Sequence, residues 1–299
     1  MSIAGLTLFG APKPFLGHFG IIQRNAIASW TKLEPRPKVI LFGAEEGAAE
    51  CASELGLVHV AEIARNRLGT PLLPDLFTRA EALSDGDVMA YVNADIILPG
   101  NVSRAVDLIK KNHERFLAVG RRTNLLVTAP IDFSKDWEAT LKKRVREAGQ
   151  LESHTAIDLF IFSKGLFEQI PPLVIGRVWF DQWCIKYARE KRVPVIDITE
   201  FATLVHQNHD YSHVVGGKEK RVYGGEEAEE NLRYYGSRPH TYTILSATHA
   251  MSATGRIKRV YFRKGWNATR YRLWDIFIRR THSVRRRIGL TRKRTAAAE

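Results

Sequence analysis

A carboxylate that directly follows a strongly apolar run is the first feature of the sequence that could do chemistry. Asn93, Ala94 and Asp95 come at the end of the apolar stretch 88–92, and further apolar residues follow them. Burying an unpaired charge costs free energy. Mg²⁺ or Mn²⁺ would remove that cost, because these ions prefer oxygen ligands and often bind one or two carboxylates together with substrate phosphates. The alternative is a turn or helix-capping acid, which is common at strand ends.

A histidine-rich segment forms the second candidate site. His206, His209, Asp210 and His213 lie within eight residues, after another apolar run. Imidazole is a common ligand of transition metals, so the cluster as a whole favours a metal site. A single histidine in such a segment is more simply explained by hydrogen bonds to the backbone. A self-contained zinc site is not expected, because no fourth close-spaced Cys or His completes it.

Asp181 is the third candidate, because aromatic residues surround it at the start of a helix-like stretch. Trp179, Phe180 and Trp183 are its neighbours in the chain. Aromatic walls can hold the face of a sugar, and they raise the pKa of a carboxylate by desolvation. An aspartate in this setting could take a proton from an acceptor hydroxyl. A helix N-cap is the equal alternative.

The elements that must position these residues alternate between apolar runs and stretches with helical spacing. Up to residue 120 we predict strands at 6–9, 39–42, 58–63, 88–92 and 116–120, and helices at 21–33, 71–83, 102–111 and up to residue 55. Later we predict helices at 137–148 and 180–190 and strands at 157–162, 194–198 and 202–205. This order predicts an α/β fold with a mixed, mostly parallel sheet covered on both faces. Ligands of such sheets bind beyond the carboxyl ends of the strands, which points to the turns at Glu45, Asp95 and His206.

The net charge of +13 is confined to the end of the chain. From residue 255 onwards there are 15 basic and two acidic residues, so the preceding part is neutral. A basic helix with aromatic anchors suits an anionic membrane surface. The alternative is a helix whose apolar face packs on the catalytic domain or on a second subunit of a homo-oligomer. Nucleic acid is disfavoured as a partner, because the neutral body adds no basic patch.

The two cysteines and the N-terminal residues indicate a cytoplasmic protein. Cys51 and Cys184 form no CxxC or metal-ligand pair, which is typical of reduced core thiols. The sequence contains neither a signal-peptide pattern nor an apolar span of about 18 residues. We therefore expect a soluble protein, or one attached peripherally to the inner face of the membrane through its tail.

Taken together, the acidic turn, the Asn93-Ala94-Asp95 triplet, the Asp181 region and the late histidine segment resemble the GT-A glycosyltransferases, particularly family 2 and related bacterial enzymes. The resemblance covers roughly residues 5–250. It implies a Rossmann-like catalytic domain at 1–252, with a nucleotide-sugar half at about 1–120 and an acceptor half at about 121–252. The basic helical tail would then occupy residues 253–299. The implied activity is inverting transfer of a sugar from a nucleotide-sugar donor to an acceptor hydroxyl, in the synthesis of a bacterial surface glycan or glycolipid.

The resemblance also implies how the donor is bound. In that family an Asp-x-Asp triplet binds the metal and the ribose and diphosphate of the donor. Asp95 matches the metal-binding second Asp, whereas Asn93 replaces the first and can still hydrogen-bond a ribose hydroxyl. A late histidine, His206 or His209, completes the shell of the Mn²⁺ or Mg²⁺ ion.

Further residues follow from the same resemblance. An acid after the second strand, Glu45 or Glu46, contacts the nucleoside, and Arg65 and Asn66 fall where a base or phosphate contact is often found. Asp181 matches the catalytic base.

On the acceptor side, the aromatic residues Trp179 and Trp183 would hold a sugar face. Asp158 would bind acceptor hydroxyls, or else it is a buried turn acid. Arg121 and Arg122 follow a predicted strand and are further acceptor candidates.

Two other functions remain open from the sequence. A sugar-phosphate nucleotidyltransferase uses a similar sheet, but it usually has a Gly-rich basic loop after the first strand. Here that loop, 10–14, holds one Gly and one Lys. A catalytically inactive nucleotide-sugar-binding protein is the other alternative, and Asn93 is its best support.

Overall fold

A computed structural model describes residues 5–209, 223–236 and 241–260 of the chain. The chain divides into two compact units, Met1–Arg259 and Val260–Glu299, and the description below concerns the first. The predicted basic tail beyond residue 260, and with it the expected membrane surface, lies outside the described residues. Asp210 and His213 of the histidine segment lie outside them as well.

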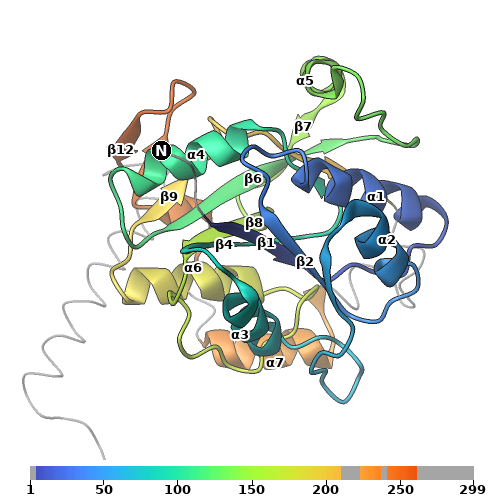
Figure 1. The fold of residues 1–299 in the computed structure, drawn as a ribbon. Helices are drawn as coiled ribbons and strands as arrows, with labels where there is room; N and C mark the ends of the chain where they lie inside the picture. Colours follow the sequence, from blue (N-terminus) through green and yellow to red (C-terminus); the bar gives the residue numbers. More distant parts are fainter. Residues whose placement is uncertain (1–4, 210–222, 237–240, 261–299) are drawn as a thin grey trace, which may run out of the picture. The chain divides into compact units, whose positions relative to one another are not determined.

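One sheet runs through the first unit, in the order β12-β11-β9-β6-β8-β4-β1-β2-β3 (Figure 1). Neighbouring strands are parallel except that β8 is antiparallel to both β4 and β6, and β12 to β11. The mixed, mostly parallel sheet predicted from the sequence is therefore confirmed. The strands are β1 Leu6–Gly10, β2 Lys38–Phe42, β3 Val58–Val60, β4 Val88–Val92, β6 Leu117–Leu125, β8 Ile157–Ser163, β9 Val195–Asp197, β11 His249–Met251 and β12 Ile257–Arg259.

Three short strands lie off this path and extend the sheet near the candidate site. They are β5 Ile96–Ile97, β7 Gln150–Leu151 and β10 Leu204–Gln207. β10 is parallel to the second half of β6 and antiparallel to β5. Because β6 extends well past β8, it carries β10 and β7 beyond the main sheet.

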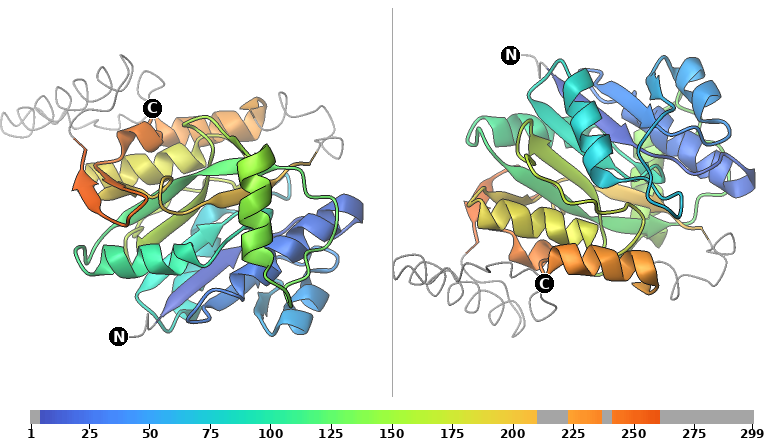
Figure 2. Two further views of the ribbon diagram at one scale, coloured as in Figure 1. Left: turned by 90° about the horizontal axis from the view of Figure 1, so that it is seen from above. Right: turned by 90° about the horizontal axis from the view of Figure 1, so that it is seen from below.

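Helices cover both faces of the sheet, as Figures 1 and 2 show. On one face lie α1 Gly17–Trp30, α2 Ala48–Leu55 and α4 Asn101–Lys110. On the other lie α3 Leu73–Leu83, α6 Phe180–Glu190 and α7 Glu226–Tyr235. α5 Trp137–Ala148 packs over β5, β10 and the end of β6. Within the described ranges, no helix combines the length and the apolar character needed to cross a membrane.

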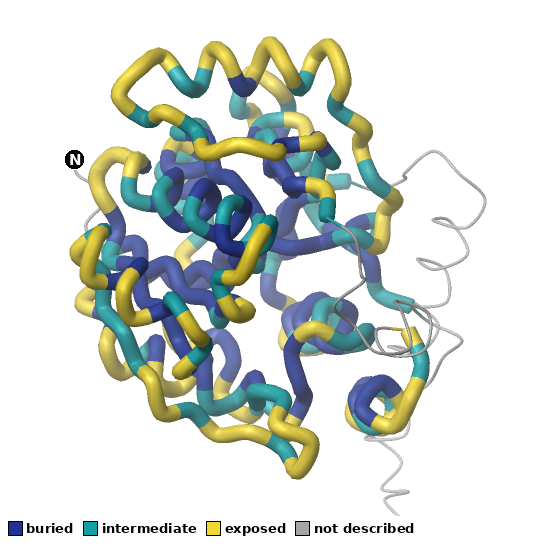
Figure 3. The backbone as a smooth tube through the Cα atoms, turned by 90° about the vertical axis from the view of Figure 1, so that its right-hand side faces the viewer, coloured by how far each residue is buried: buried dark blue, intermediate teal, exposed yellow. Residues whose placement is uncertain are grey.

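The central strands β1, β2, β4 and β8 are buried on both faces, because alternate side chains enter two separate cores. Figure 3 colours the buried residues of the backbone dark blue. In β1, Leu6 and Leu8 pack under α1, α2 and α4, whereas Phe9 packs under α3 and α6. Phe9 meets Phe77 edge-on at 5.1 Å, and Phe77 stacks on Phe162 at 5.2 Å. Such aromatic pairs contribute about 0.5–1.5 kcal/mol each beyond their buried area.

The structure adds elements that the sequence patterns did not predict. α7 is rich in Glu and has only a few buried positions, so its apolar spacing is weak. β5 has only two residues. One expectation was wrong in detail: His206 does not follow its strand but lies inside β10. Antiparallel pairing of His206 with Ile96 extends the strand past the apolar run.

Candidate active site

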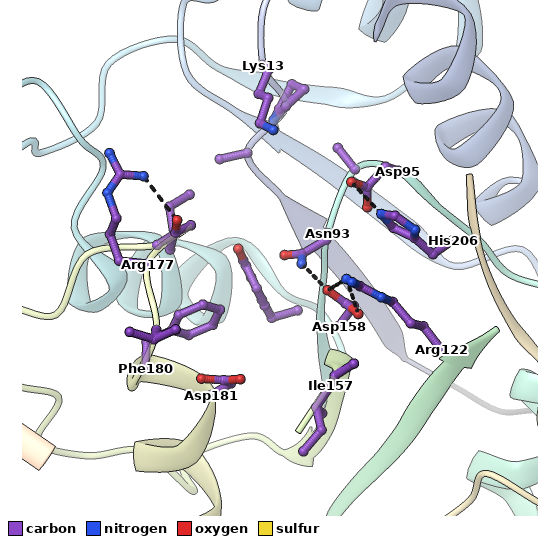
Figure 4. A pocket seen from close by; sticks show the side chains of 18 of the residues that line it. Lys13, Asn93, Asp95, Arg122, Ile157, Asp158, Arg177, Phe180, Asp181 and His206 are labelled. Carbon is purple, nitrogen blue, oxygen red and sulfur yellow. Dashed lines mark hydrogen bonds and ion pairs between the residues drawn. The ribbon is translucent and has the colours of Figure 1, made fainter. Parts of the chain in front are cut away.

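A cavity of about 550 Å³ lies at the edge of the sheet where β1, β2 and β4 end. β8 runs the other way, so its first residues reach the same edge. The cavity brings together predicted site residues from six segments of the chain (Figure 4). Those that line it are Glu45, Asn93, Asp95, Arg122, Asp158, Asp181, His206 and His209.

The close approach of two strands sets the position of Asp95. A Cβ atom on Gly10 would lie 2.6 Å from the carbonyl oxygen of Val92, so only glycine allows β1 and β4 to meet here. The segment after Asp95 is fixed by helix α1. Trp30 donates its indole N–H to the Ile96 carbonyl at 2.9 Å, and the Leu98 amide donates to the Ser29 hydroxyl at 3.0 Å.

Asp95, His206 and His209 form a cluster that could hold a metal ion. Their ligand atoms all lie within 4.8 Å of one another. The Nε2 atoms of His206 and His209 lie 3.6 and 3.2 Å from Oδ2 of Asp95. Burial alone would raise the pKa of Asp95, but the two imidazoles outweigh it and hold that pKa well below its usual range. Asp95 is therefore a carboxylate, as a cation ligand must be.

Two side chains, one fully buried and one half-buried, pack behind this cluster. Gln207 is fully buried, and its amide donates to the carbonyls of Ile22 and Asp95 while it accepts from Asn25. The ring of Phe19 lies 5.0 Å from that of His209. The cluster is thus built onto helix α1 as well as onto the sheet, which favours a fixed geometry.

Asp181 occupies the first turn of α6, on another wall of the cavity. Burial raises its pKa to about 7, and the nearby Asp158 adds to that rise. Its Oδ2 accepts from the Gln182 amide at 3.1 Å, and its Oδ1 is buried with no hydrogen-bond partner among the described residues. The half-protonated state expected near neutral pH suits an acid or base in proton transfer.

The residue that precedes α6 has an unusual backbone conformation. Trp179 has φ = 86°, in the left-handed region that a bulky side chain rarely adopts. Its amide donates to the Gln182 side chain at 2.8 Å, and its ring packs 5.2 Å from that of Tyr235. Such strain is stored mostly at functional sites, and here it sets the direction of the first turn that carries Asp181.

Asp158 lies at the base of the cavity in an ion pair. Its carboxylate accepts from Arg122 at 3.1 and 3.2 Å and from the Asn93 amide at 2.6 Å. One N–H of the Asn93 side-chain amide is therefore bound to Asp158, which leaves the second N–H and the carbonyl oxygen for other partners.

Glu45 and its neighbours form the wall that continues from β2. Glu45 pairs with Arg65 at 2.7 Å. Gly43 has φ = 107°, and a Cβ atom there would lie 2.0 Å from Glu45 Oε2, so the turn requires glycine. Glu46 is exposed and does not line the cavity, nor does Arg65, whose place is behind Glu45.

The remaining predicted residues lie outside the cavity lining. Asn66 accepts from the amides of Leu68 and Thr70 and donates to Glu227, so it closes a turn. Trp183 is buried in the core, with its ring 5.0 Å from that of Tyr187. Trp179 packs against α7 as described.

Sequence reasoning missed two basic residues that line the cavity, Lys13 and Arg177. Lys13 lies in the loop after β1, at a carboxyl strand end, so the positional rule that singled out Glu45 and Asp95 could have found it. Arg177 is held by Glu227 of α7 through bonds of 2.7 and 2.8 Å. Because α7 itself was not predicted, nothing in the sequence indicated that partner.

Comparisons with solved structures decide the fold. No family model and no curated protein matches the sequence. The crystal structure of residues 1–349 of S. aureus TarS in complex with UDP-GlcNAc superimposes with a TM-score of 0.50, at 12% identity, over 79% of this chain. The chain has a GT-A-type fold. It spans 65% of the length of that TarS chain.

A second similar structure is that of glucosyl-3-phosphoglycerate synthase from Mycobacterium tuberculosis, in complex with Mn²⁺, UDP and phosphoglyceric acid. It has a TM-score of 0.45 and 14% identity, over 77% of this chain and 78% of that one. The likeness to the TarS structure confirms the GT-A fold that the resemblance implies. The roles implied for single residues remain predictions.

Proposed function

We propose that the protein is a metal-dependent, inverting glycosyltransferase that moves a sugar from a nucleotide-sugar donor to an acceptor hydroxyl. One observation carries the proposal: the Asp95–His206–His209 cluster and the Asp181 carboxyl line the same cavity, at the strand ends of a GT-A fold. A cation site and a base with a matched pKa are the two parts that this reaction requires.

The residues fit a divalent cation. Asp95 Oδ1 is buried and has no hydrogen-bond partner among the described residues, and such an atom is costly unless a ligand satisfies it. One carboxylate and two imidazoles favour Mn²⁺ over Mg²⁺, because Mg²⁺ prefers oxygen ligands alone. When bound, the cation would neutralise charge that builds on the leaving nucleoside diphosphate.

The residues of the chain would then divide the remaining work. Asp181 takes the proton of the acceptor hydroxyl as that oxygen forms its bond to the anomeric carbon. The bond from this carbon to the diphosphate oxygen breaks on the opposite side, so the configuration inverts. Glu45 would contact the nucleoside, and the carbonyl oxygen of Asn93 would accept from a ribose hydroxyl. The acceptor would be a glycan, a glycolipid or another hydroxyl compound of bacterial surface-glycan synthesis.

The activity can be tested by release of nucleoside diphosphate from a panel of nucleotide sugars, with Mn²⁺ and with a chelator. We expect release from at least one donor, and loss of that release with chelator. Pyrophosphate release instead would show a nucleotidyltransferase. Donor binding without release, with every acceptor class offered, would show an inactive binding protein.

The pKa of Asp181 predicts a pH dependence. The base works only as the carboxylate, and its raised pKa of about 7 means that this form is lost as the pH falls below neutrality. With saturating Mn²⁺, kcat/KM should fall roughly tenfold per pH unit below about pH 7 and level off above it. A profile that stays flat down to about pH 5.5, with the metal site still occupied, would contradict this role.

A further inference from the structure

The loop between β1 and α1 holds Lys13 in a fixed place on the cavity wall. Gln23 of α1 is almost fully buried and bonds both backbone groups of Lys13. Its Oε1 accepts from the Lys13 amide at 2.6 Å, and its Nε2 donates to the Lys13 carbonyl at 2.8 Å. One buried side chain therefore sets the position from which the Lys13 side chain enters the cavity, as Figure 4 shows.

The ring of Phe19 lies between the ammonium group of Lys13 and the Asp95–His206–His209 cluster. Lys13 Nζ lies over the ring of Phe19, 5.0 Å from its centroid. The same ring lies 5.0 Å from that of His209. Phe19 thus contacts both the ammonium and one member of the Asp95 cluster.

The charged groups around Lys13 indicate that this part of the cavity favours an anion. Desolvation lowers the pKa of Lys13; Asp95 opposes this effect and Arg177 adds to it. The ammonium of Lys13 therefore interacts electrostatically with both Asp95 and Arg177, which line the same cavity. An anion bound in this part of the cavity would be attracted to the ammonium of Lys13 and to the guanidinium of Arg177, which also pairs with Glu227.

The charge of the proposed cation site alone would not balance the charge of a bound diphosphate. Residue 93 is an asparagine, and Asp95 is the only acid of the cluster among the residues that the structure describes. A divalent cation on Asp95 leaves one positive charge, whereas the diphosphate of a nucleotide sugar carries two negative charges. One further cation balances the complex, and more charge develops as the bond to the sugar breaks.

We propose that Lys13 binds the diphosphate of the donor, beside the cation held by Asp95, His206 and His209, with Arg177 flanking the same group. This inference rests on the proposed function, because it presumes a nucleotide-sugar donor. Charge-assisted hydrogen bonds from lysine to phosphate are among the stronger contacts of a binding site.

The test compares nucleoside diphosphates with their nucleosides. UDP, GDP, ADP, CDP and dTDP, and each matching nucleoside, are titrated by calorimetry into wild type and Lys13→Met in the presence of Mn²⁺. For the nucleotide that wild type binds, Lys13→Met should weaken diphosphate binding about tenfold or more and change nucleoside binding by less than about twofold. Lys13→Arg should recover part of the loss, and Lys38→Met, at the opposite end of β2, should leave both unchanged.

The outcomes separate this inference from the function on which it rests. If Lys13→Met weakens the binding of the nucleoside and of the nucleoside diphosphate equally, Lys13 has only a structural role and the proposal is overturned. Wild-type affinity of Lys13→Met for the diphosphate would also overturn it. If wild type itself binds none of the diphosphates, the proposed function fails and the inference fails with it. If Lys13→Met does not fold, judged by its thermal melt, the same comparison is made with Lys13→Gln.

Discussion

Replacing Asp181 with Asn should remove sugar transfer while donor binding persists. The substitution keeps the shape of the side chain and its contact with Gln182, but the amide cannot accept a proton. Loss of a general base lowers turnover by about 10²–10⁴-fold, and we expect about 10³-fold here because little water reaches the buried Oδ1 to replace it. The measurements are kcat from nucleoside diphosphate release and donor affinity from calorimetry.

The matched control is Asp85→Asn. Asp85 is an exposed aspartate paired with Lys38, just before β4 and away from the cavity. Its replacement should leave kcat unchanged. If Asp181→Asn keeps wild-type turnover, Asp181 is only a helix-capping or cavity-wall residue, and the base must be sought elsewhere.

Loss of the cation from the Asp95–His206–His209 cluster should reduce turnover by about as much as loss of the base. Either chelation or His209→Gln should reduce turnover by about 10³-fold, because diphosphate departure then lacks its main positive charge. In His209→Gln one of the two imidazoles that contact Asp95 is gone. Mn²⁺ affinity, followed by electron paramagnetic resonance, should fall at least about tenfold. Added Mn²⁺ should restore the turnover of chelated wild type. The variant should regain turnover only at a much higher Mn²⁺ concentration than wild type requires.

A second histidine pair supplies the control. His113 and His249 lie with ring centroids 5.1 Å apart, away from the cavity. His113→Gln should therefore retain both Mn²⁺ affinity and turnover. Full turnover of His209→Gln, or of wild type in chelator, would show that the reaction does not depend on the cation at this cluster.

Position relative to the strands allowed much of the site to be predicted. Glu45 and Asp95 follow strongly apolar strands, and the carboxyl ends of parallel strands meet at one edge. The aromatic neighbours of Asp181 predict a raised pKa for its carboxyl, and burial in the structure raises that pKa to about 7. The sequence left open which of His206 and His209 joins Asp95, and the structure brings both to the same carboxylate oxygen.

What could not be predicted depends on contacts distant in sequence. From the sequence, Trp183 suggests a surface for a sugar beside Asp181, but at the fourth position of α6 its side chain packs into the core. Arg177 reaches the cavity through Glu227, 50 residues further along. The loop of Lys13 lacks a glycine-rich pattern, so the sequence did not indicate a ligand site there. In the structure, the side chain of Gln23 fixes this loop through bonds to the backbone of Lys13. Local spacing carries no information about such partners.

The most direct measurement is a crystal structure with Mn²⁺ and an intact nucleotide sugar, using anomalous scattering to locate the metal. We expect one Mn²⁺ peak between Asp95, His206 and His209, a diphosphate bound to it, and the anomeric carbon turned towards Asp181. A peak elsewhere, or a sugar whose anomeric carbon faces away from Asp181 with another group between them, would contradict a single active site built from these residues.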